Sequence, residues 1–202
     1  MRIILASASP QRRQLLEGLH VKFEVMPSTF AESDHPERDP ASRAKVLARM
    51  KAQEVHGRVP DACIIGCDTL VVAPDGTLLE KPADAKDAER MLRLQSGGVS
   101  TVHSALCVIG SKGIHEGISS SRVQFKALSD ADISWWLSTG QWKDRSGAFQ
   151  IDGPGQLMIE RIEGDWTGVV GLPVFLLGQL LEEEGVKWKM DPTSPRIRGA
   201  RN

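Results

Sequence analysis

The chain has 202 residues, of which 41% are hydrophobic and 25% charged, a composition typical of one compact domain or two small lobes. Lys and Arg number 25 against 26 Asp and Glu, so the chain lacks the basic excess that non-specific nucleic-acid binding requires. Its apolar runs are far shorter than the roughly 18 residues of a membrane span, and no signal-peptide pattern is present. We therefore expect a cytoplasmic protein that binds neither nucleic acid nor a membrane.

The first half of the chain alternates apolar runs with helical patterns. Residues 3–6 predict a strand, and a helix follows with Ser9 as its N-cap and Pro10 at its first position. A second strand is predicted at 21–26, before a polar, acidic loop at 28–40. Further predictions are a helix at 40–56, a buried strand at 62–66, a hairpin of 70–73 with 77–79, and a helix at 84–95.

The second half contains longer strands. Two are predicted at 100–109 and 114–128, and a helix follows at 129–138. The segment 147–156 is rich in glycine. The remaining predictions are a hairpin made of 157–162 and 166–170, and a final amphipathic helix at 173–184.

This order of β-α units and hairpins predicts an α/β fold, with a mixed, twisted sheet flanked by helices and a cleft between two lobes. We expect residues 1–185 to form one domain that contains both lobes. Residues 186–202 carry five basic residues and one acidic residue, and we predict that they form a flexible basic tail.

The three cysteines do not predict a metal or redox site. Structural zinc normally takes four Cys or His ligands at turn spacing, whereas Cys63 and Cys67 lie in an apolar run typical of a strand. We expect these two and Cys107 to be buried, reduced thiols.

The loop from Ser7 to Arg12 is a candidate phosphate site. It brings two serine hydroxyls and free backbone N–H groups to a helix N-terminus, and Arg12 adds a cation that suits phosphate. An ordinary Ser-Pro helix cap with an exposed arginine explains the same residues, and spacing alone does not decide between the two interpretations.

Asp68 is a candidate for catalysis because it stands between two apolar runs, where we expect the strand to leave the apolar layer. A carboxylate in this place must be solvated in a cleft, paired with a cation or bound to a metal, since burying it alone is costly. The alternative is an aspartate that caps a strand bend together with Thr69.

Three further residues matter only as a set. Glu32 lies in the acidic loop, Lys51 lies near a helix end, and Lys81 precedes a proline, and each alone is typical of a solvated surface. Together with Arg12 and Asp68 they supply three cations and two carboxylates, which suits a metal-bound triphosphate.

These segments resemble, in chain order, the motifs of the Maf family of nucleoside triphosphate pyrophosphatases. The resemblance covers about residues 3–184 and implies a Maf/ITPase-like fold. It rests on the Ser-x-Ser-Pro-x-Arg loop at 7–12, Glu32, the Lys-Ala helix end at 51–52, Gly-x-Asp-Thr at 66–69, Lys-Pro at 81–82, the glycine-rich segment at 147–153 and Val-Gly-Leu-Pro at 170–173.

The resemblance implies hydrolysis of a nucleoside triphosphate to the monophosphate and pyrophosphate, by attack of water at the α-phosphorus. Asp68 would be the catalytic carboxylate, as proton acceptor, metal ligand or both, and Glu32 would assist with the metal. The implied cofactor is a divalent cation, Mg²⁺ or Mn²⁺, and the family suggests a homodimer. The residues expected to hold the phosphates are Ser9, Arg12, Lys51 and Lys81.

The positions that resemble the family's substrate-discriminating ones point to different bases. Thr69 resembles the branch that acts on dTTP and UTP, where the 7-methyl-GTP branch has Gln. Asp152 is closer to the Glu of the 7-methyl-GTP branch than to the Gln of the pyrimidine branch, and Gln11 matches neither. We favour dTTP and UTP, with modified nucleotides as the alternative. The expected substrate-binding residues are Ser7, Ser9, Gln11, Arg12, Thr69, Lys81, Gln150 and Asp152.

A second hypothesis comes from a different functional class. The chain could be a nucleotide-binding regulator of cell division or septum formation that needs no turnover. Asp68, Glu32 and the three cations favour the enzyme, because a binding protein has no need of a carboxylate that activates water.

Overall fold

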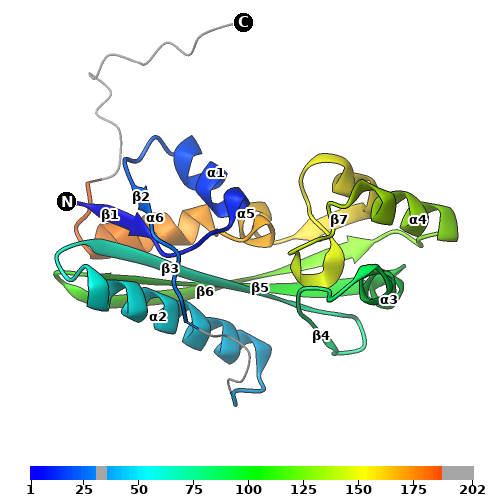
Figure 1. Cartoon of the computed structure of the whole chain (residues 1–202), viewed down its shortest axis with the longest axis horizontal. Helices are drawn as coiled ribbons and strands as arrows, with labels where there is room; N and C mark the ends of the chain where they lie inside the picture. The colour runs from blue at the N-terminus through cyan, green and yellow to red at the C-terminus, as the bar shows by residue number, and fades with distance from the viewer. Residues whose placement is uncertain (31–35, 188–202) are drawn as a thin grey trace, which may run out of the picture.

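The computed structural model describes residues 1–30 and 36–187, which form one mixed sheet with helices on both faces (Figure 1). The strand order is β2-β1-β3-β5-β6-β7, and β4 pairs with the end of β3. β1 runs parallel to β2 and β3, and the other pairs are antiparallel. The predicted α/β class is confirmed. The strands are β1 (Ile3–Leu5), β2 (Glu24–Val25), β3 (Cys63–Val72), β4 (Leu78–Leu79), β5 (Val99–Gly110), β6 (Gly113–Phe125) and β7 (Ile159–Glu163).

Polar side chains start most of the helices. Ser9 caps α1 and Pro10 is its first residue, as predicted, while Asp39, Asp84 and Ser129 cap α2, α3 and α4. In the part of the chain that the structure describes, no helix has the length and apolar character needed to cross a membrane. The helices are α1 (Pro10–Gly18), α2 (Pro40–Arg58), α3 (Ala85–Gln95), α4 (Asp130–Thr139), α5 (Trp166–Val170) and α6 (Val174–Glu183), with the 3-10 helices η1 (Ser146–Ala148) and η2 (Gly153–Met158).

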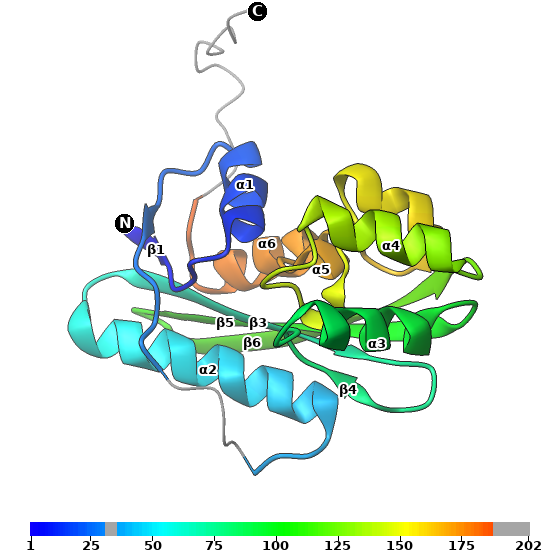
Figure 2. The same ribbon diagram turned by 45° about the vertical axis from the view of Figure 1, so that its right-hand side comes forward.

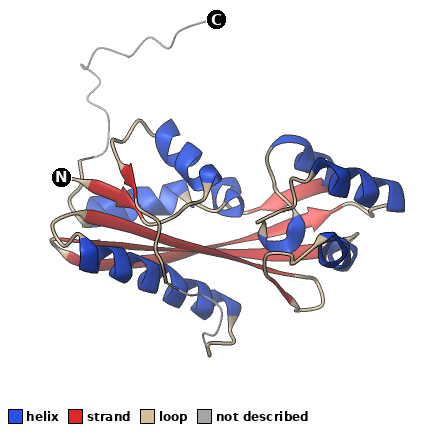
Figure 3. Ribbon diagram, viewed as in Figure 1, coloured by secondary structure: helices blue, strands red, loops and turns tan. Residues whose placement is uncertain are grey.

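α2 lies on one side of β3, and α1 and α6 lie on the other (Figures 2 and 3). Alternate residues of the strand face these two helix layers. Ile64 packs with the alanines of α2, whereas Cys63 and Ile65 pack with leucines of α1 and α6. Each fully buried Ile or Leu side chain stabilises the fold by about 1.5–3 kcal/mol, so the two layers fix which way every residue of β3 points. Asp68 therefore faces α2, and Thr69 faces the layer of α1 and α6.

Gly66 lets α2 approach β3 closely. A Cβ atom at this position would lie 2.3 Å from the backbone oxygen of Ala48 and 2.7 Å from Cβ of Ala52. Any larger residue would push the helix away from the strand. The close approach brings the α2 face that carries Lys51 against the β3 residues that follow Gly66.

Three predicted elements differ from the structure. β3 runs to Val72, so Asp68 lies inside a strand and not where the strand leaves the apolar layer, because β5 pairs with it along this whole stretch. The strand predicted at 166–170 is the helix α5, since the Asp165 side chain caps a helical turn there. The second strand is short, because β1 offers it only two paired positions.

The three cysteines are free and buried, as predicted. Burial raises the pKa of Cys63 to about 12 and also raises the pKa of Cys67 and Cys107. All three lie in the central strands β3 and β5.

Candidate active site

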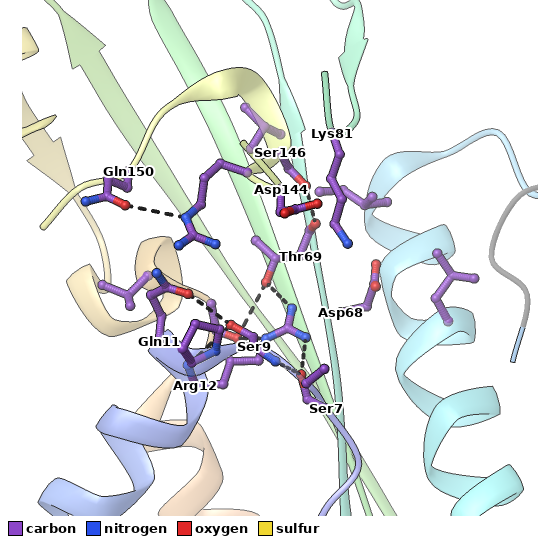
Figure 4. A pocket seen from close by; sticks show the side chains of 18 of the residues that line it. Ser7, Ser9, Gln11, Arg12, Asp68, Thr69, Lys81, Asp144, Ser146 and Gln150 are labelled. Atoms are coloured by element: carbon purple, nitrogen blue, oxygen red, sulfur yellow. Dashed lines mark hydrogen bonds between the residues drawn. The ribbon is translucent and has the colours of Figure 1, made fainter. Parts of the chain in front are cut away.

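One edge of β3 is open in its middle. β1 pairs with Cys63 to Ile65 and β4 pairs with Val71 and Val72, so within the described residues no strand lies beside 66–70 on this edge. Neighbouring segments that leave a sheet in different directions create a crevice, the usual ligand site of α/β proteins. Here the crevice is a cleft of about 890 Å³. Figure 4 shows side chains from α1, β3 and the loop after α4 meeting in it.

Asp68 lines this cleft on the face of β3 that α2 covers. It is 4% exposed, and its Oδ1 accepts a 2.6 Å hydrogen bond from Lys51 Nζ. The other oxygen, Oδ2, is buried and has no hydrogen-bond partner among the described residues. The carboxylate is thus paired with a cation through one oxygen, while the second is available to a ligand or water.

Lys51 is more deeply buried than a helix-end lysine would be. It lies inside α2 and is 7% exposed, so the sequence-based view of it as a solvated residue near the helix end is wrong. The physical reason is the close packing at Gly66, which removes water from this side of the helix. A buried ammonium group needs an opposite charge, and Asp68 supplies it.

Arg12 holds several chain segments together on the side of the cleft opposite Asp68 and Lys51. Within the described residues, four of the five N–H groups of its guanidinium donate to protein acceptors, and the fifth has no acceptor there. Its predicted contact with phosphate stays a prediction, and in this structure Arg12 mainly joins the first loop, β3 and the link between α5 and α6. The four bonds run from Nε to Gly171 O (2.9 Å), from Nη1 to Ser7 Oγ and Cys67 O (3.1 Å each), and from Nη2 to Thr69 Oγ1 (3.1 Å).

The Thr69 hydroxyl belongs to the same network. It lies 2.9 Å from Ser104 Oγ, and Ser104 in turn donates to the backbone oxygen of Gly168 at 2.6 Å. Thr69 also lines the cleft. The hydroxyl therefore orients Arg12 at the wall of the cleft that Thr69 lines.

The N-terminus of α1 opens onto the cleft. Ser7, Ser9 and Gln11 line the cleft, and Ser7 Oγ accepts a 3.2 Å bond from the backbone N–H of Ser9. Ser9 Oγ donates to Gln11 Oε1 at 3.3 Å. The first turn of α1 contains no acidic residue, so the positive end of the helix dipole remains available to an anion.

The wall of the cleft opposite α1 is formed by residues 143–146 and by residues 147–153. Residues 147–153 are here called the glycine loop. Gln150 and Asp152, both predicted from the sequence, line the cleft. Gln150 Nε2 donates to Gln141 Oε1 at 2.8 Å, and Arg145 Nε donates to Gln150 Oε1 at 3.4 Å. Two residues of this wall, Asp144 and Ala148, have left-handed backbone angles that are uncommon for non-glycine residues.

Lys81 enters the cleft from the segment between β4 and α3. Figure 4 shows its ammonium group pointing toward Asp68, with Asp144 and Ser146 on the same side of the view. The structure therefore brings together the predicted residues Asp68, Lys51 and Lys81 from β3, α2 and the segment between β4 and α3.

Several cleft residues were missed by sequence analysis. Arg43 precedes Lys51 by two helical turns, so helical spacing from Lys51 is a signal that could have found it. Its Nη2 donates to Glu80 Oε1 at 2.8 Å, and its Nε is buried without a partner among the described residues. The charged run Lys143, Asp144 and Arg145, just before the glycine loop, is a second unused signal, and Ser146, which follows it, also lines the cleft.

Glu32, predicted as the second metal ligand, lies outside the described residues. Within the described residues, no group of three or more His, Cys, Asp or Glu side chains is arranged to hold a metal. Asp68 Oδ2 is a buried oxygen that has no hydrogen-bond partner in residues 1–30 and 36–187. Mg²⁺ is commonly held by one or two carboxylates together with waters and substrate phosphates, so this oxygen fits such an ion.

A family sequence model described as "Maf-like protein" matches residues 2–184. The chain belongs to the Maf family. In this Maf chain the matched residues extend from β1 to the end of α6 and contain every residue predicted for the site.

Curated relatives match this Maf chain over most of its length. The "dTTP/UTP pyrophosphatase" of Deinococcus radiodurans is 44% identical and covers 92% of this chain and 94% of its own. Proteins of the same name from Treponema denticola (42% identical, 90% and 96% covered) and Pyrococcus abyssi (41% identical, 89% and 95% covered) are similar to it as well. A solved structure, "Structure of a HAM1 protein from Coxiella burnetii", is 11% identical with a TM-score of 0.49, over 92% of this chain and 98% of its own.

Proposed function

We propose that this Maf chain is a nucleoside triphosphate pyrophosphatase that acts on dTTP and UTP. The relatives that match nearly its whole length carry this activity in their names. The single structural observation that supports the reaction is the Asp68 carboxylate, which is buried beside a large cleft. One of its oxygens is paired with Lys51, and the other has no partner among the described residues.

In the proposed reaction, a water molecule attacks the α-phosphorus of the nucleotide. Asp68 Oδ2 accepts a proton from this water as its oxygen forms the new bond to phosphorus. The bond from the α-phosphorus to the bridging oxygen breaks, and pyrophosphate leaves with that oxygen and its electron pair. Lys51 holds Oδ1 and so fixes which oxygen of Asp68 faces the water.

The triphosphate needs positive charge, because charge builds on the phosphate oxygens as the bridge breaks. Lys81, Arg43, Lys143 and Arg145 line the cleft and, with the N-terminus of α1, provide it. Arg12 contributes its one remaining N–H group and holds Ser7 and Thr69 in place. Ser7 and Ser9 add hydroxyl groups at the same end of the cleft.

We propose a divalent cation, Mg²⁺ or Mn²⁺, as the cofactor. The carboxylates of Asp68 and Glu32 would hold it together with phosphate oxygens. When bound, such an ion supplies positive charge at the phosphate and lowers the pKa of a bound water.

The base would lie between Gln11, Thr69 and the glycine loop. Asp152 accepts hydrogen bonds and donates none when ionised, so it suits a base edge that carries an N–H group, such as N3–H of uracil or thymine. The same carboxylate suits a guanine edge, which is why 7-methyl-GTP belongs in the test. A homodimer and a cytoplasmic location stay predictions.

The decisive experiment measures pyrophosphate release from dTTP, UTP, GTP and 7-methyl-GTP with Mg²⁺ or Mn²⁺, in water enriched in ¹⁸O. We expect dTTP and UTP to be hydrolysed fastest, with the label in the monophosphate because water attacks the α-phosphorus. Label in pyrophosphate would exclude this site of attack. Tight nucleotide binding with no release above a metal-only blank would instead support the regulator.

A further inference from the structure

A buried amide supports the wall of the cleft opposite α1 and takes no part in the proposed reaction. Gln95, the last residue of α3, is fully buried, as is Ser100 in β5. Among the described residues, Gln95 is the one buried amide side chain. A buried amide normally has hydrogen-bond partners, and those of Gln95 lead directly to the glycine loop.

Every N–H group of the Gln95 side chain has an acceptor. Its Nε2 donates to the backbone oxygen of Gly147 at 2.7 Å and to that of Met91 at 3.1 Å. Its Oε1 accepts a 3.2 Å bond from Ser100 Oγ. Because Ser100 fixes Oε1 and Met91 takes one hydrogen, the second hydrogen points at Gly147.

Gly147 is held at both of its polar groups. Its N–H donates to the backbone oxygen of Glu80 at 3.1 Å, directly before Lys81, while its oxygen accepts from Gln95. Gly147 has φ 73°, and a Cβ atom there would lie 3.1 Å from Val71 and 3.3 Å from Gln95 Oε1. The start of the glycine loop is therefore seated between α3 and the segment that carries Lys81.

The next residue is held in a similar way. Ala148 also has a left-handed backbone, with φ 57°, and its oxygen accepts a 2.8 Å bond from Nε1 of the fully buried Trp136. Strained backbone of this kind persists only where the surroundings determine it. Two buried donors on successive carbonyls meet that requirement (Figure 2 shows α3 beside the yellow segment of the loop).

We propose that Gln95 is a positioning residue for nucleotide recognition, because it orients the Gly147 peptide and so places the Gln150 and Asp152 side chains in the cleft. This inference rests on the proposed function. Asp68 and Lys51 lie on β3 and α2, outside these contacts, so loss of the Gln95 bond acts on nucleotide affinity more than on the chemical step. A misplacement of about 1 Å can cost an enzyme up to about a hundredfold, and here we expect the loss in binding, because the displaced segment carries the residues expected to contact the base.

The test compares three variants of the full chain. Gln95→Met keeps the length of the side chain and removes its donors, and Ser100→Ala removes only the bond that fixes Oε1. Glu184→Gln serves as the control, because Glu184 is a buried polar residue bonded to Lys112 and His115 and does not line the cleft. The measurements are kcat and KM for dTTP, the Kd of an α,β-imido dTTP analogue by calorimetry, and the Tm of each variant.

We expect Gln95→Met to raise KM and the analogue Kd by about tenfold or more, with kcat within about threefold of the wild type. We expect Ser100→Ala to raise KM and the analogue Kd by a smaller factor. If Gln95→Met does not fold, Ser100→Ala tests the inference in its place. Glu184→Gln leaves both constants unchanged while it lowers Tm. Unaltered KM and Kd in the folded Gln95 and Ser100 variants would overturn the inference, whereas a wild type that releases no pyrophosphate would overturn the proposed function instead.

Discussion

The two oxygens of Asp68 lie in different environments. Replacing Asp68 by asparagine tests the charge of the carboxylate, because the side chain keeps nearly the same shape. Oδ1 is paired with Lys51, and Oδ2 is buried without a partner among the described residues. An asparagine has nearly the same volume but neither accepts a proton nor balances the charge of Lys51.

We expect Asp68→Asn to keep the fold and to lower kcat by about a hundredfold or more, the usual scale for loss of an acid-base group. Pyrophosphate release at saturating dTTP measures the effect, and circular dichroism checks the fold. Asp61→Asn, a change at an exposed carboxylate that does not line the cleft, is the matched control. Near-wild-type turnover by folded Asp68→Asn would remove Asp68 from the mechanism.

Asp152→Gln tests recognition of the base. A glutamine both donates and accepts, so it can pair with a carbonyl and an N–H group of a pyrimidine. One matched hydrogen bond is worth about 0.5–1.5 kcal/mol, and we expect kcat/KM for dTTP and UTP to rise about threefold to tenfold relative to GTP. The values of kcat/KM for dTTP, UTP and GTP are measured in parallel for the variant and the wild type. An equal change for all three nucleotides means that Asp152 does not read the base.

The residues of the site differ in how far the sequence could predict them. Asp68 was predictable because a charge inside an apolar run demands an explanation. Lys51 was predicted from the family motif, but its burial depends on the contact of α2 with Gly66, which the local pattern does not contain. The partners of Arg12 extend to Gly171, and hydrogen bonds between segments so far apart in the chain leave no periodic signal.

At the scale of elements, Arg12 connects α1, β3 and the link before α6, so its removal should weaken the fold as well as the activity. We expect Arg12→Ala to lower Tm by roughly 5 °C or more, because hydrogen bonds to a charged group contribute about 1.5–3 kcal/mol each. Differential scanning calorimetry measures the shift. Arg13→Ala is the control, since Arg13 is exposed and its one ion pair among the described residues is with Glu17 in its own helix. Equal Tm values for the two variants would show that the network of Arg12 is not structural.

Most elements could be predicted because local signals are strong: α1, α3 and α4 have side-chain caps at the expected positions, and β5 and β6 are long strands joined by a short turn that contains two glycines. The failures come from tertiary contacts. β3 continues through Asp68 because β5 pairs with it there, although the polar residue favours a break. The short α5 follows from a cap at Asp165, which outweighs the alternating pattern after it.

At the scale of the whole molecule, Glu184 fastens the turn between β5 and β6 to the end of α6. Its carboxylate accepts hydrogen bonds from the backbone N–H of Lys112, from Ser111 Oγ at 3.0 Å and from His115 Nε2 at 3.2 Å. Burial raises the pKa of Glu184, but these hydrogen bonds outweigh burial, so its pKa lies below the ordinary value of 4.5.

This lowered pKa predicts how stability depends on pH. A carboxyl group with a lower pKa in the folded state stabilises the protein fully above its unfolded pKa, and the contribution is lost as the pH falls through the folded value. We expect wild type to exceed Glu184→Gln by about 1–3 kcal/mol in free energy of unfolding at pH 7, and by less at pH 3.5. Urea unfolding at both pH values measures this, and a difference that is the same at both would contradict it.

The rate at which the three buried thiols are alkylated reports how often the central strands open. A thiolate is the form that reacts with alkylating reagents, and burial both shields these cysteines and raises their pKa, so labelling requires the sheet to open. Cys67 directly precedes Asp68 in β3. A nucleotide that binds only the closed cleft lowers the population of opened molecules, so slower alkylation of Cys67 would record occupancy of the cleft without any turnover.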